Sequence, residues 1–297
     1  MKAGLPPPGP HGGDGARVAL ALGVDPGAVL DLSASTNPFG PDVAGAARRH
    51  LDALGRYPDG AAATSALAAA IGVDADRLLV TNGGSEAIAL VAAALGGRVE
   101  EPEFSLHPRG GGPRWRSNPH NPTGRLAPPG ERAEVWDEAF YPLAMGRWTR
   151  GDAGAVVVGS LTKLWACPGL RLGYVVADPD LVARLAAAQP CWSVGGLALA
   201  LVPELLEATD LAGWAAGIGE LRRELSGVLA AHELAPAASD APYVLCTRAA
   251  GLRARLAPYG VVVRDCTSFG LPGHARVAVP TAAGLERLAA ALEASAP

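Results

Sequence analysis

The chain has 297 residues, of which 49% are hydrophobic and 18% charged, with a formal net charge of -4 and a pI near 5.9. A chain of this length and composition can bury a large core. It has no Lys/Arg block of the kind that binds nucleic acid, no run approaching the ~18 apolar residues of a spanning helix and no apolar signal segment after Met1, so we expect a cytoplasmic protein without nucleic-acid or membrane partners.

Cysteine spacing bears on metal binding and disulfides. The four cysteines are widely separated, and none lies in a CxxC or CxH pattern. This spacing indicates neither a zinc site nor a disulfide framework, so we expect reduced thiols and no metal.

The first part of the chain alternates turns with short elements. Residues 1–10 hold four prolines and two glycines, which predicts an extended arm. Periodicity predicts a helix over residues 15–22 and a strand over residues 29–33. A second helix is expected over residues 41–54, with Pro in its first turn and Gly55 at its end.

Three turns in this part carry polar or aromatic side chains. His11 opens a His-Gly-Gly-Asp stretch. Ser35 and Asn37 lie in Ser-Ala-Ser-Thr-Asn-Pro-Phe-Gly, where Asx-turn chemistry alone would account for them. Tyr57 lies in Arg-Tyr-Pro-Asp-Gly, where a loop aromatic that packs on the next helix is the simple alternative.

The sequence next predicts an anion-binding turn. A strand over residues 77–81 leads through Asn-Gly-Gly-Ser-Glu into a helix over residues 87–95. Free backbone N–H groups and the positive end of a helix then face the same point, where an anion can bind. Gly83, Gly84 and the hydroxyl of Ser85 are the candidate donors, although any strand–helix unit can contain such a turn.

An aromatic residue, an amide and a carboxylate follow. Phe104 comes directly after Glu-Pro-Glu and could be a core residue. Asn121 lies in Asn-Pro-Thr-Gly, which is a strong turn signal. Residues 134–140 predict a strand that contains Asp137, and an acid in a buried strand is costly unless it is paired. We therefore expect a buried cationic partner for Asp137.

The most informative stretch is residues 160–174, Ser-Leu-Thr-Lys-Leu-Trp-Ala-Cys-Pro-Gly-Leu-Arg-Leu-Gly-Tyr. Apolar runs on both sides predict buried strands, so Lys163 is expected in a loop between them. Burial lowers the pKa of an amine and makes it a competent Schiff-base former. Ser160 and Arg171 offer a hydroxyl and a planar cation suited to a phosphate. A surface lysine beside an ordinary ion pair is the alternative, because the SxxK pattern alone is common.

The rest of the chain is read as mixed α and β structure. We expect strands over residues 155–159, 172–176, 242–247, 261–264 and 276–279, and helices over residues 178–188, 194–208, 210–232, 252–256 and 282–292. Arg264 and Arg276 fall in two of the late strands, where surface ion pairs would be their commoner role.

Residues 160–174 resemble the lysine motif of the fold type I pyridoxal 5'-phosphate (PLP) enzymes, the class I/II aminotransferase family. Within that family the stretch is similar to histidinol-phosphate aminotransferases and, more closely, to threonine-phosphate decarboxylases of cobalamin synthesis. Further motifs follow in family order from His11 to Arg276. The resemblance implies PLP as cofactor and an α/β fold of fold type I, with a mostly parallel sheet in a large domain, a small α+β domain, and a homodimer with a shared active site.

We expect the large domain over residues 56–205, and the small domain from an N-terminal arm, residues 1–55, together with residues 206–297. The resemblance also implies a role for each matching residue, Lys163 and Asp137 being the catalytic ones. It implies cofactor contacts from Gly83, Gly84, Ser85, Phe104, Asn121, Asp137, Ser160, Lys163, Arg171 and, across the dimer, Tyr57, and substrate contacts from His11, Ser35, Asn37, Arg264 and Arg276.

The sequence departs from the family by two shortenings, over residues 105–120 and 125–136. The family has a strand–helix–strand passage at the first of these, a unit of about 30 or more residues. We expect the central sheet to have lost peripheral strand and helix material there.

The expected reaction depends on Phe140, which occupies the position where aminotransferases usually have a tyrosine. Tyr141 cannot replace it, because neighbouring strand residues face opposite sides. This difference favours decarboxylation over transamination, with Lys163 as general base or acid. His11 and Arg264 are left over once the other anion-binding groups are assigned, which favours an amino acid phosphate as substrate. An aminotransferase of the histidinol-phosphate type and a PLP-binding pseudoenzyme are the alternatives.

Overall fold

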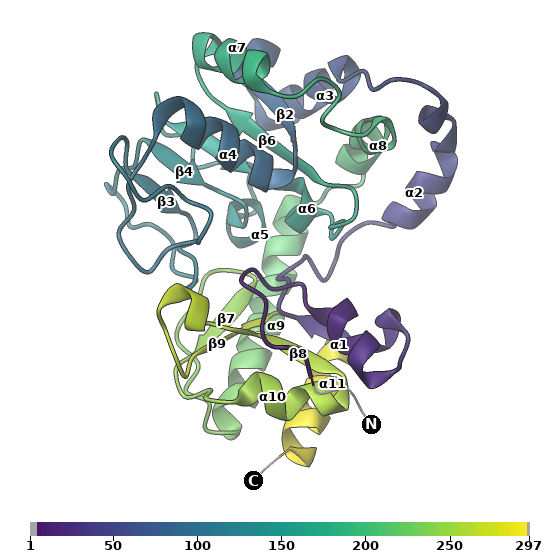
Figure 1. The fold of residues 1–297 in the computed structure, drawn as a ribbon, viewed down its shortest axis with the longest axis vertical. Coiled ribbons are helices and arrows are strands. Elements are labelled where there is room, and N and C mark those ends of the chain that lie inside the picture. Colours follow the sequence, from purple (N-terminus) through teal and green to yellow (C-terminus); the bar gives the residue numbers. More distant parts are fainter. Residues whose placement is uncertain (1–4, 296–297) are drawn as a thin grey trace.

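The computed structural model describes residues 5–295, and it arranges them around two β-sheets, one above the other in Figure 1. The helices are α1 (Gly15–Leu22), α2 (Val43–Arg49), α3 (Ala61–Ile71), α4 (Gly83–Leu95), α5 (Tyr141–Met145), α6 (Leu161–Leu164), α7 (Pro179–Ala188), α8 (Gly196–Glu207), α9 (Leu211–Ala231), α10 (Leu252–Leu256) and α11 (Ala282–Ala294). The strands are β1 (Leu30–Leu32), β2 (Leu78–Asn82), β3 (Trp115–Ser117), β4 (Val135–Asp137), β5 (Val156–Gly159), β6 (Leu172–Val176), β7 (Tyr243–Cys246), β8 (Val261–Asp265) and β9 (Ala275–Ala278).

The upper sheet has five strands in the order β2-β6-β5-β4-β3. The pairs β3–β4 and β4–β5 are parallel, whereas β6 is antiparallel to both β5 and β2. Four strands therefore end at one edge of the sheet, and β6 begins there. The expected α/β fold with a mostly parallel sheet is confirmed.

Helices cover both faces of this sheet, because its central strands are apolar on both sides. Val156 and Val158 of β5 pack with α4 and α7, while Val157 faces α3, α5 and α8. This alternation follows from the two-residue repeat of a strand. The runs predicted as buried strands from their β-branched residues thus lie in the middle of the upper sheet.

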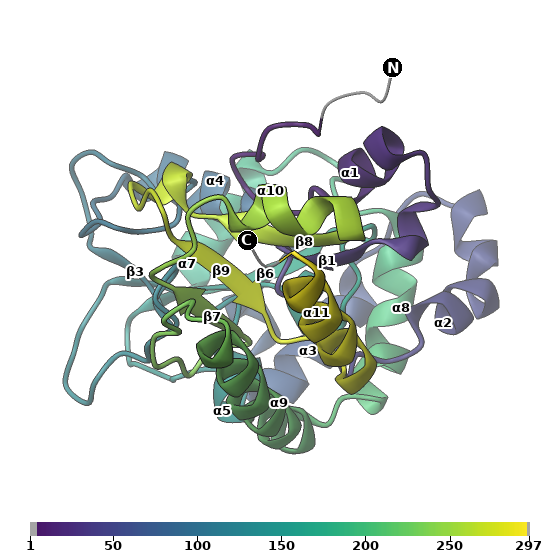
Figure 2. The same ribbon diagram turned by 90° about the horizontal axis from the view of Figure 1, so that it is seen from below.

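The lower sheet has the order β1-β8-β9-β7, with β1 parallel to β8 and the other pairs antiparallel. Helices α9 and α11 lie side by side on one face of it (Figure 2). Helix α9 also packs on α5, and one apolar cluster includes Val157 of the upper sheet and Val263 of the lower. The two sheets thus share part of their core.

Four expectations about local structure need correction. The strand predicted over residues 134–140 ends at Asp137, and Phe140 and Tyr141 lie at the start of α5, so the alternation of strand residues does not separate them. The helix predicted over residues 41–54 is α2 followed by a 3-10 turn, and α2 starts after Asp42, whose side chain accepts from Gly45 N–H as an N-cap. Helix α4 starts at Gly83 instead of residue 87. Lys163 lies on the short helix α6, not in a loop.

Of the two shortened segments, in which we expect the loss of peripheral material, the first contains β3, the strand at one edge of the upper sheet, and the second follows it. Residues 118–134 join the parallel strands β3 and β4 without forming a helix or strand, where a parallel crossover usually contains a helix. The strands that end beside Lys163 are retained. No helix among residues 5–295 is long and apolar enough to cross a membrane.

The packing of α4 on β6 depends on Gly173. A Cβ atom at this position would lie 2.5 Å from the backbone of Gly83 and Gly84, at the start of α4. We predict that Gly173→Ala lowers the free energy of unfolding by about 1–3 kcal/mol, because backbone atoms would have to move. Urea denaturation measures this, with Gly169→Ala as control because that site is open. Equal losses in the two variants would contradict the prediction.

Candidate active site

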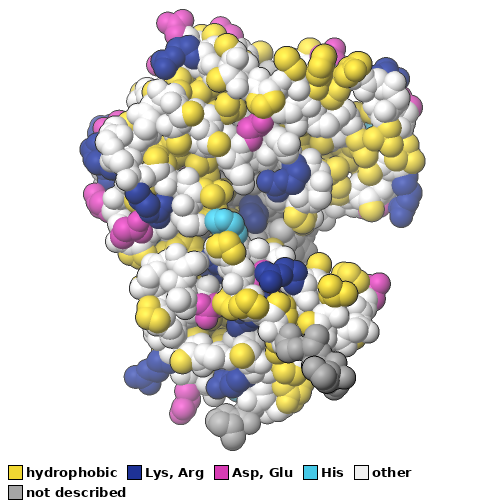
Figure 3. Space-filling view, viewed as in Figure 1, with side chains coloured by type: hydrophobic (Ala, Val, Ile, Leu, Met, Phe, Trp, Pro, Cys, Tyr) yellow, Lys and Arg dark blue, Asp and Glu magenta, His cyan; other side chains and the backbone are white. Residues whose placement is uncertain are grey.

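A cavity lies where the strand ends of the upper sheet face the lower sheet, and Figure 3 shows the surface hollowed between these parts with Lys and Arg side chains beside the hollow. Of the residues predicted from sequence, the cavity brings together His11, Gly84, Ser85, Phe104, Asn121, Asp137, Ser160, Lys163, Arg171 and Arg276. The topology explains this, because β2, β4 and β5 end at this edge and β6 begins there.

One end of the cavity is built to bind an anion. Helix α4 begins with Gly83, and no side chain caps its first N–H groups. The hydroxyls of Ser85 and Ser160 and the guanidinium of Arg171 line the same end. Gly83 has φ +75°, and a Cβ there would collide with the guanidinium of Arg171, so a glycine lets this cation lie against the helix start. The sequence argument for this turn agrees with that geometry.

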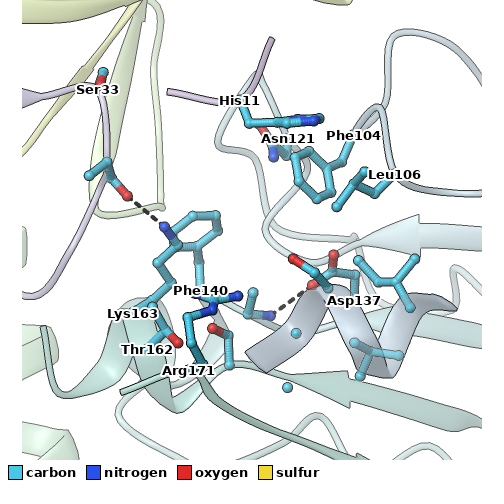
Figure 4. Close-up of a pocket in the computed structure, with 18 of the residues that line it drawn as sticks. His11, Ser33, Phe104, Leu106, Asn121, Asp137, Phe140, Thr162, Lys163 and Arg171 are labelled. Atoms are coloured by element: carbon cyan, nitrogen blue, oxygen red, sulfur yellow. Dashed lines mark hydrogen bonds between the residues drawn. The ribbon is translucent and has the colours of Figure 1, made fainter. Parts of the chain in front are cut away.

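Lys163 projects into the cavity from α6, and its Nζ donates a hydrogen bond of 2.8 Å to the carbonyl oxygen of Ala34 (Figure 4). Burial, together with the positive charges of Arg276 and Arg171, lowers the pKa of Lys163 to about 8. A minority of this amine is therefore neutral near physiological pH, but a far larger fraction than in an ordinary lysine, and the neutral form is nucleophilic.

Asp137 lies at the end of β4 with only 7% of its surface exposed. Its Oδ1 accepts from Ala139 N–H at 3.0 Å, and its Oδ2 lies 2.9 Å from Nε2 of His107. The other ring nitrogen of His107 has no hydrogen-bond partner and lies 3.8 Å from Glu103. A buried carboxylate that lines the cavity is thus held in place by a backbone N–H group and a histidine ring.

Sequence reasoning missed His107, which lies in the shortened segment 105–120. It is 30 residues from Asp137, and no spacing rule links a loop histidine to a distant strand end. The only feature of the sequence that pointed to His107 was its place three residues after Phe104, in a loop that must lie close to the strand ends.

Arg276 enters the cavity from β9 of the lower sheet. Its Nη1 donates to Oδ1 of Asn121 at 2.6 Å, and its Nε is buried without a partner. Only 5% of the residue is exposed, and no carboxylate of residues 5–295 lies within 4.0 Å of its guanidinium. A cation in this environment favours an anionic ligand.

The remaining predicted residues do not line the cavity. Asn37 is buried and donates to the carbonyl oxygen of Leu164, which fixes the end of α6. Ser35 is buried beside Ala34 with φ +51°. Gly83 lies behind Arg171, as described above.

Tyr57 and Arg264 also lie outside the cavity. Tyr57 is 78% exposed, with its ring 4.6 Å from that of Trp192. Arg264 donates to the carbonyl oxygen of Gly9 at 2.6 Å, to that of Pro10 and to Ser268 Oγ at 2.7 Å. Arg264 therefore anchors the N-terminal arm just before His11, which does line the cavity.

Comparisons with known proteins agree with this geometry. Residues 115–292 match the family model for aminotransferase class I and II. The chain is 31% identical to threonine-phosphate decarboxylase of Salmonella typhimurium, with 95% of each chain covered. It is 27% identical to histidinol-phosphate aminotransferase 2 of Methylococcus capsulatus, covering 89% of this chain and 90% of that protein. Both alignments, over 347 and 332 positions, exceed the 297 residues here, so these relatives contain segments that this chain lacks.

Solved structures share the fold. Histidinol-phosphate aminotransferase from Sinorhizobium meliloti, in complex with pyridoxal-5'-phosphate, aligns with a TM-score of 0.80 at 17% identity over 94% of both chains. L-threonine-O-3-phosphate decarboxylase from Porphyromonas gingivalis aligns with a TM-score of 0.76 at 23% identity, covering 90% of this chain and 99% of that one.

The lowered pKa of Lys163 gives a testable pH dependence. Only a neutral amine reacts with acetic anhydride, so modification of Lys163 should rise with pH through a midpoint near 8. An ordinary lysine has a pKa of about 10.4. The chain contains one other lysine, Lys2, which serves as internal control. Site-resolved mass spectrometry measures both profiles, and a Lys163 midpoint at the ordinary value would contradict the electrostatic account.

Proposed function

Because the chain belongs to the class I and II aminotransferase family, whose members depend on PLP, we propose that its cavity binds PLP at Lys163 and acts on a phosphorylated amino acid. The observation that carries this proposal is a partly buried, readily deprotonated amine beside an anion-binding end formed by Ser160, Arg171 and the start of α4. An aldehyde that also carries a phosphate fits both features.

The residues at the anion-binding end of the cavity suit the phosphate group of the cofactor. A Cβ at Gly84 would be in ordinary contact with Ser160, 3.6 Å from its Cβ, so Ser160 and the start of α4 face each other closely along the cavity. We propose that the N–H groups of this turn, the hydroxyls of Ser85 and Ser160 and the guanidinium of Arg171 hold the phosphate, because helix starts and planar cations both favour one.

The opposite part of the cavity fits the cofactor ring. The anionic Asp137 would hold a protonated ring nitrogen, Asn121 would bond the ring oxygen, and Phe104 would stack on the ring face. The buried Asp137 thereby gains the cationic partner that its desolvation requires. When bound, PLP withdraws electrons from the substrate Cα.

The protein's own groups would bind the substrate and move its proton. The Nζ of Lys163 alternates between neutral and protonated forms at physiological pH. It could therefore take a proton from the substrate Cα or give one to it. The carbonyl oxygen of Ala34, 2.8 Å away, orients this nitrogen. Arg276 would bind the substrate carboxylate, and the rings of His11 and Phe104, 6.1 Å apart, would cover the cavity and exclude water.

We propose decarboxylation of an amino acid phosphate as the reaction. The relative with 31% identity over 95% of the chain is a threonine-phosphate decarboxylase, and Phe140 lines the cavity without a hydroxyl. Arg264 would act on a substrate phosphate through the arm, because its bonds to Gly9 and Pro10 place His11 at the cavity. Transamination of a histidinol-phosphate type is the alternative that a substrate test distinguishes.

We further propose a homodimer with a shared site. Exposed apolar side chains gather where α2 and its following turn approach the loop before α8, including Leu51, Leu54, Tyr57 and Trp192 with 52–78% of their surfaces exposed. Apolar patches of this kind mark protein–protein contacts. Tyr57 would then reach the cofactor phosphate of the partner subunit.

The dimer has a complementation test. Tyr57→Ala and Lys163→Ala, each inactive alone, should regain partial activity when mixed and refolded, because one hybrid site would be intact. Tyr259→Ala, an exposed tyrosine away from this patch, should be active by itself. Light scattering should give twice the 30.0 kDa chain mass. A fully active monomer at micromolar concentration would exclude the shared site.

The reaction is tested by substrate choice. We expect CO2 release from L-threonine O-phosphate, with threonine binding roughly tenfold or more weakly, since one or two charge-assisted hydrogen bonds are worth about 1.5–3 kcal/mol each. Arg264→Ala should raise the KM for the phosphorylated substrate by roughly tenfold, whereas Arg248→Ala, an exposed arginine, should not. Glutamate formation from 2-oxoglutarate and histidinol phosphate without CO2 release would support the aminotransferase instead.

A further inference from the structure

The guanidinium of Arg276 is buried without a compensating acid. Among residues 5–295 no carboxylate lies within 4.0 Å of it, and its one hydrogen bond goes to the neutral amide of Asn121. A buried arginine is usually paired, because an isolated charge is costly to remove from water. Something other than an ion pair must hold this side chain in place.

Two aromatic rings lie beside the guanidinium of Arg276, where a carboxylate would usually be found. The Cζ of Arg276 lies 4.5 Å from the ring centroid of Tyr243 and 6.0 Å from that of Phe140. The two rings contact each other edge to face, with centroids 5.2 Å apart. A desolvated guanidinium over an aromatic face is attracted by the ring quadrupole. Tyr243 makes the closer contact, and its side chain is fully buried.

The strand register explains why Tyr243 is in reach. In the antiparallel pair β7–β9, Leu245 lies opposite Arg276 and Tyr243 lies opposite Ala278. Tyr243 is therefore the diagonal neighbour of Arg276 on the same face of the sheet, a distance that aromatic and long side chains span.

The hydroxyl of Tyr243 makes a second connection. It donates a hydrogen bond of 3.1 Å to the carbonyl oxygen of His120, the residue before Asn121. Tyr243 thus contacts Arg276 through its ring and fixes the backbone beside Asn121 through its hydroxyl. Both partners of the Arg276–Asn121 hydrogen bond are held by one side chain.

We propose that Tyr243 is a positioning residue that directs Arg276 into the cavity through a cation–π contact in place of a carboxylate. A carboxylate in this position would neutralise the guanidinium and compete with an incoming anion. A ring holds the cation and leaves its charge and outer N–H groups free for a ligand carboxylate. The proposal rests on the proposed function only in naming that ligand.

Two substitutions separate the ring from the hydroxyl. Tyr243→Phe keeps the aromatic face, whereas Tyr243→Met fills a similar space without one. Phe269→Leu is the matched control, since Phe269 lies under Arg264, with ring centroid and Cζ 5.4 Å apart, and does not line the cavity. Circular dichroism checks that each variant is folded, and Tyr243→Leu replaces Tyr243→Met if the latter does not fold.

The first measurement needs no substrate. Phenylglyoxal modifies exposed guanidinium groups, and peptide mapping gives its rate at Arg276. We expect several-fold faster modification of Arg276 in Tyr243→Met, and wild-type rates in Tyr243→Phe and in Phe269→Leu. Equal rates in Tyr243→Met and wild type would overturn the proposal, and so would a Tyr243→Phe rate as high as that of Tyr243→Met, because the hydroxyl would then be the cause.

The second measurement uses the PLP-loaded enzyme and two ligands that differ by a carboxylate, with binding compared as the KM for L-threonine O-phosphate and the inhibition constant of 1-amino-2-propanol phosphate. Tyr243→Met should weaken binding of the first roughly tenfold and leave the second unchanged, with Tyr243→Phe close to wild type. Equal weakening of both ligands would overturn the carboxylate role. If the wild-type enzyme binds neither ligand, the proposed substrate is wrong, and the phenylglyoxal rates still decide the positioning role.

Discussion

The structure depends on an excess of positive charge in one partly buried cavity. Lys163, Arg171 and Arg276 line it, and Asp137 is the one carboxylate among its lining residues. The two arginines help to lower the pKa of the lysine, so the same charges that favour anionic ligands also make its amine nucleophilic. A phosphate-bearing aldehyde and a carboxylate-bearing substrate would both relieve this excess, which is why PLP chemistry suits the site.

The sheet topology explains how a shortened chain retains this arrangement. The strands that end beside Lys163 are β2, β4 and β5, and β6 starts at the same edge. Gly173 lets the start of α4 lie against β6, which brings its free N–H groups to that edge. The segments that lack regular structure join β3, on the far side of the sheet. The segments without regular structure therefore flank the edge strand β3, at the opposite edge of the sheet from β2 and the start of α4.

Sequence patterns predicted the parts of the cavity lining whose residues lie close together in the chain. The Lys163 stretch and the glycine turn before α4 could be read because their donors lie within a few residues of each other. Patterns were insufficient where contacts join distant segments. His107 meets Asp137 across 30 residues, and Tyr243 meets the backbone of His120 across 123. Arg264 is a further example, because its bonds to the N-terminal arm depend on tertiary packing that no spacing rule predicts.

The central claim, that Lys163 holds the cofactor, is tested most directly by locating the cofactor on the chain. The protein loaded with PLP is reduced with borohydride, digested and analysed by mass spectrometry. Since Lys163 and Lys2 are the only lysines, the result is unambiguous. Our account predicts a pyridoxyl label on the Lys163 peptide and loss of the visible absorbance band in Lys163→Ala. A label on Lys2 alone, or a variant that keeps the same band, would contradict it.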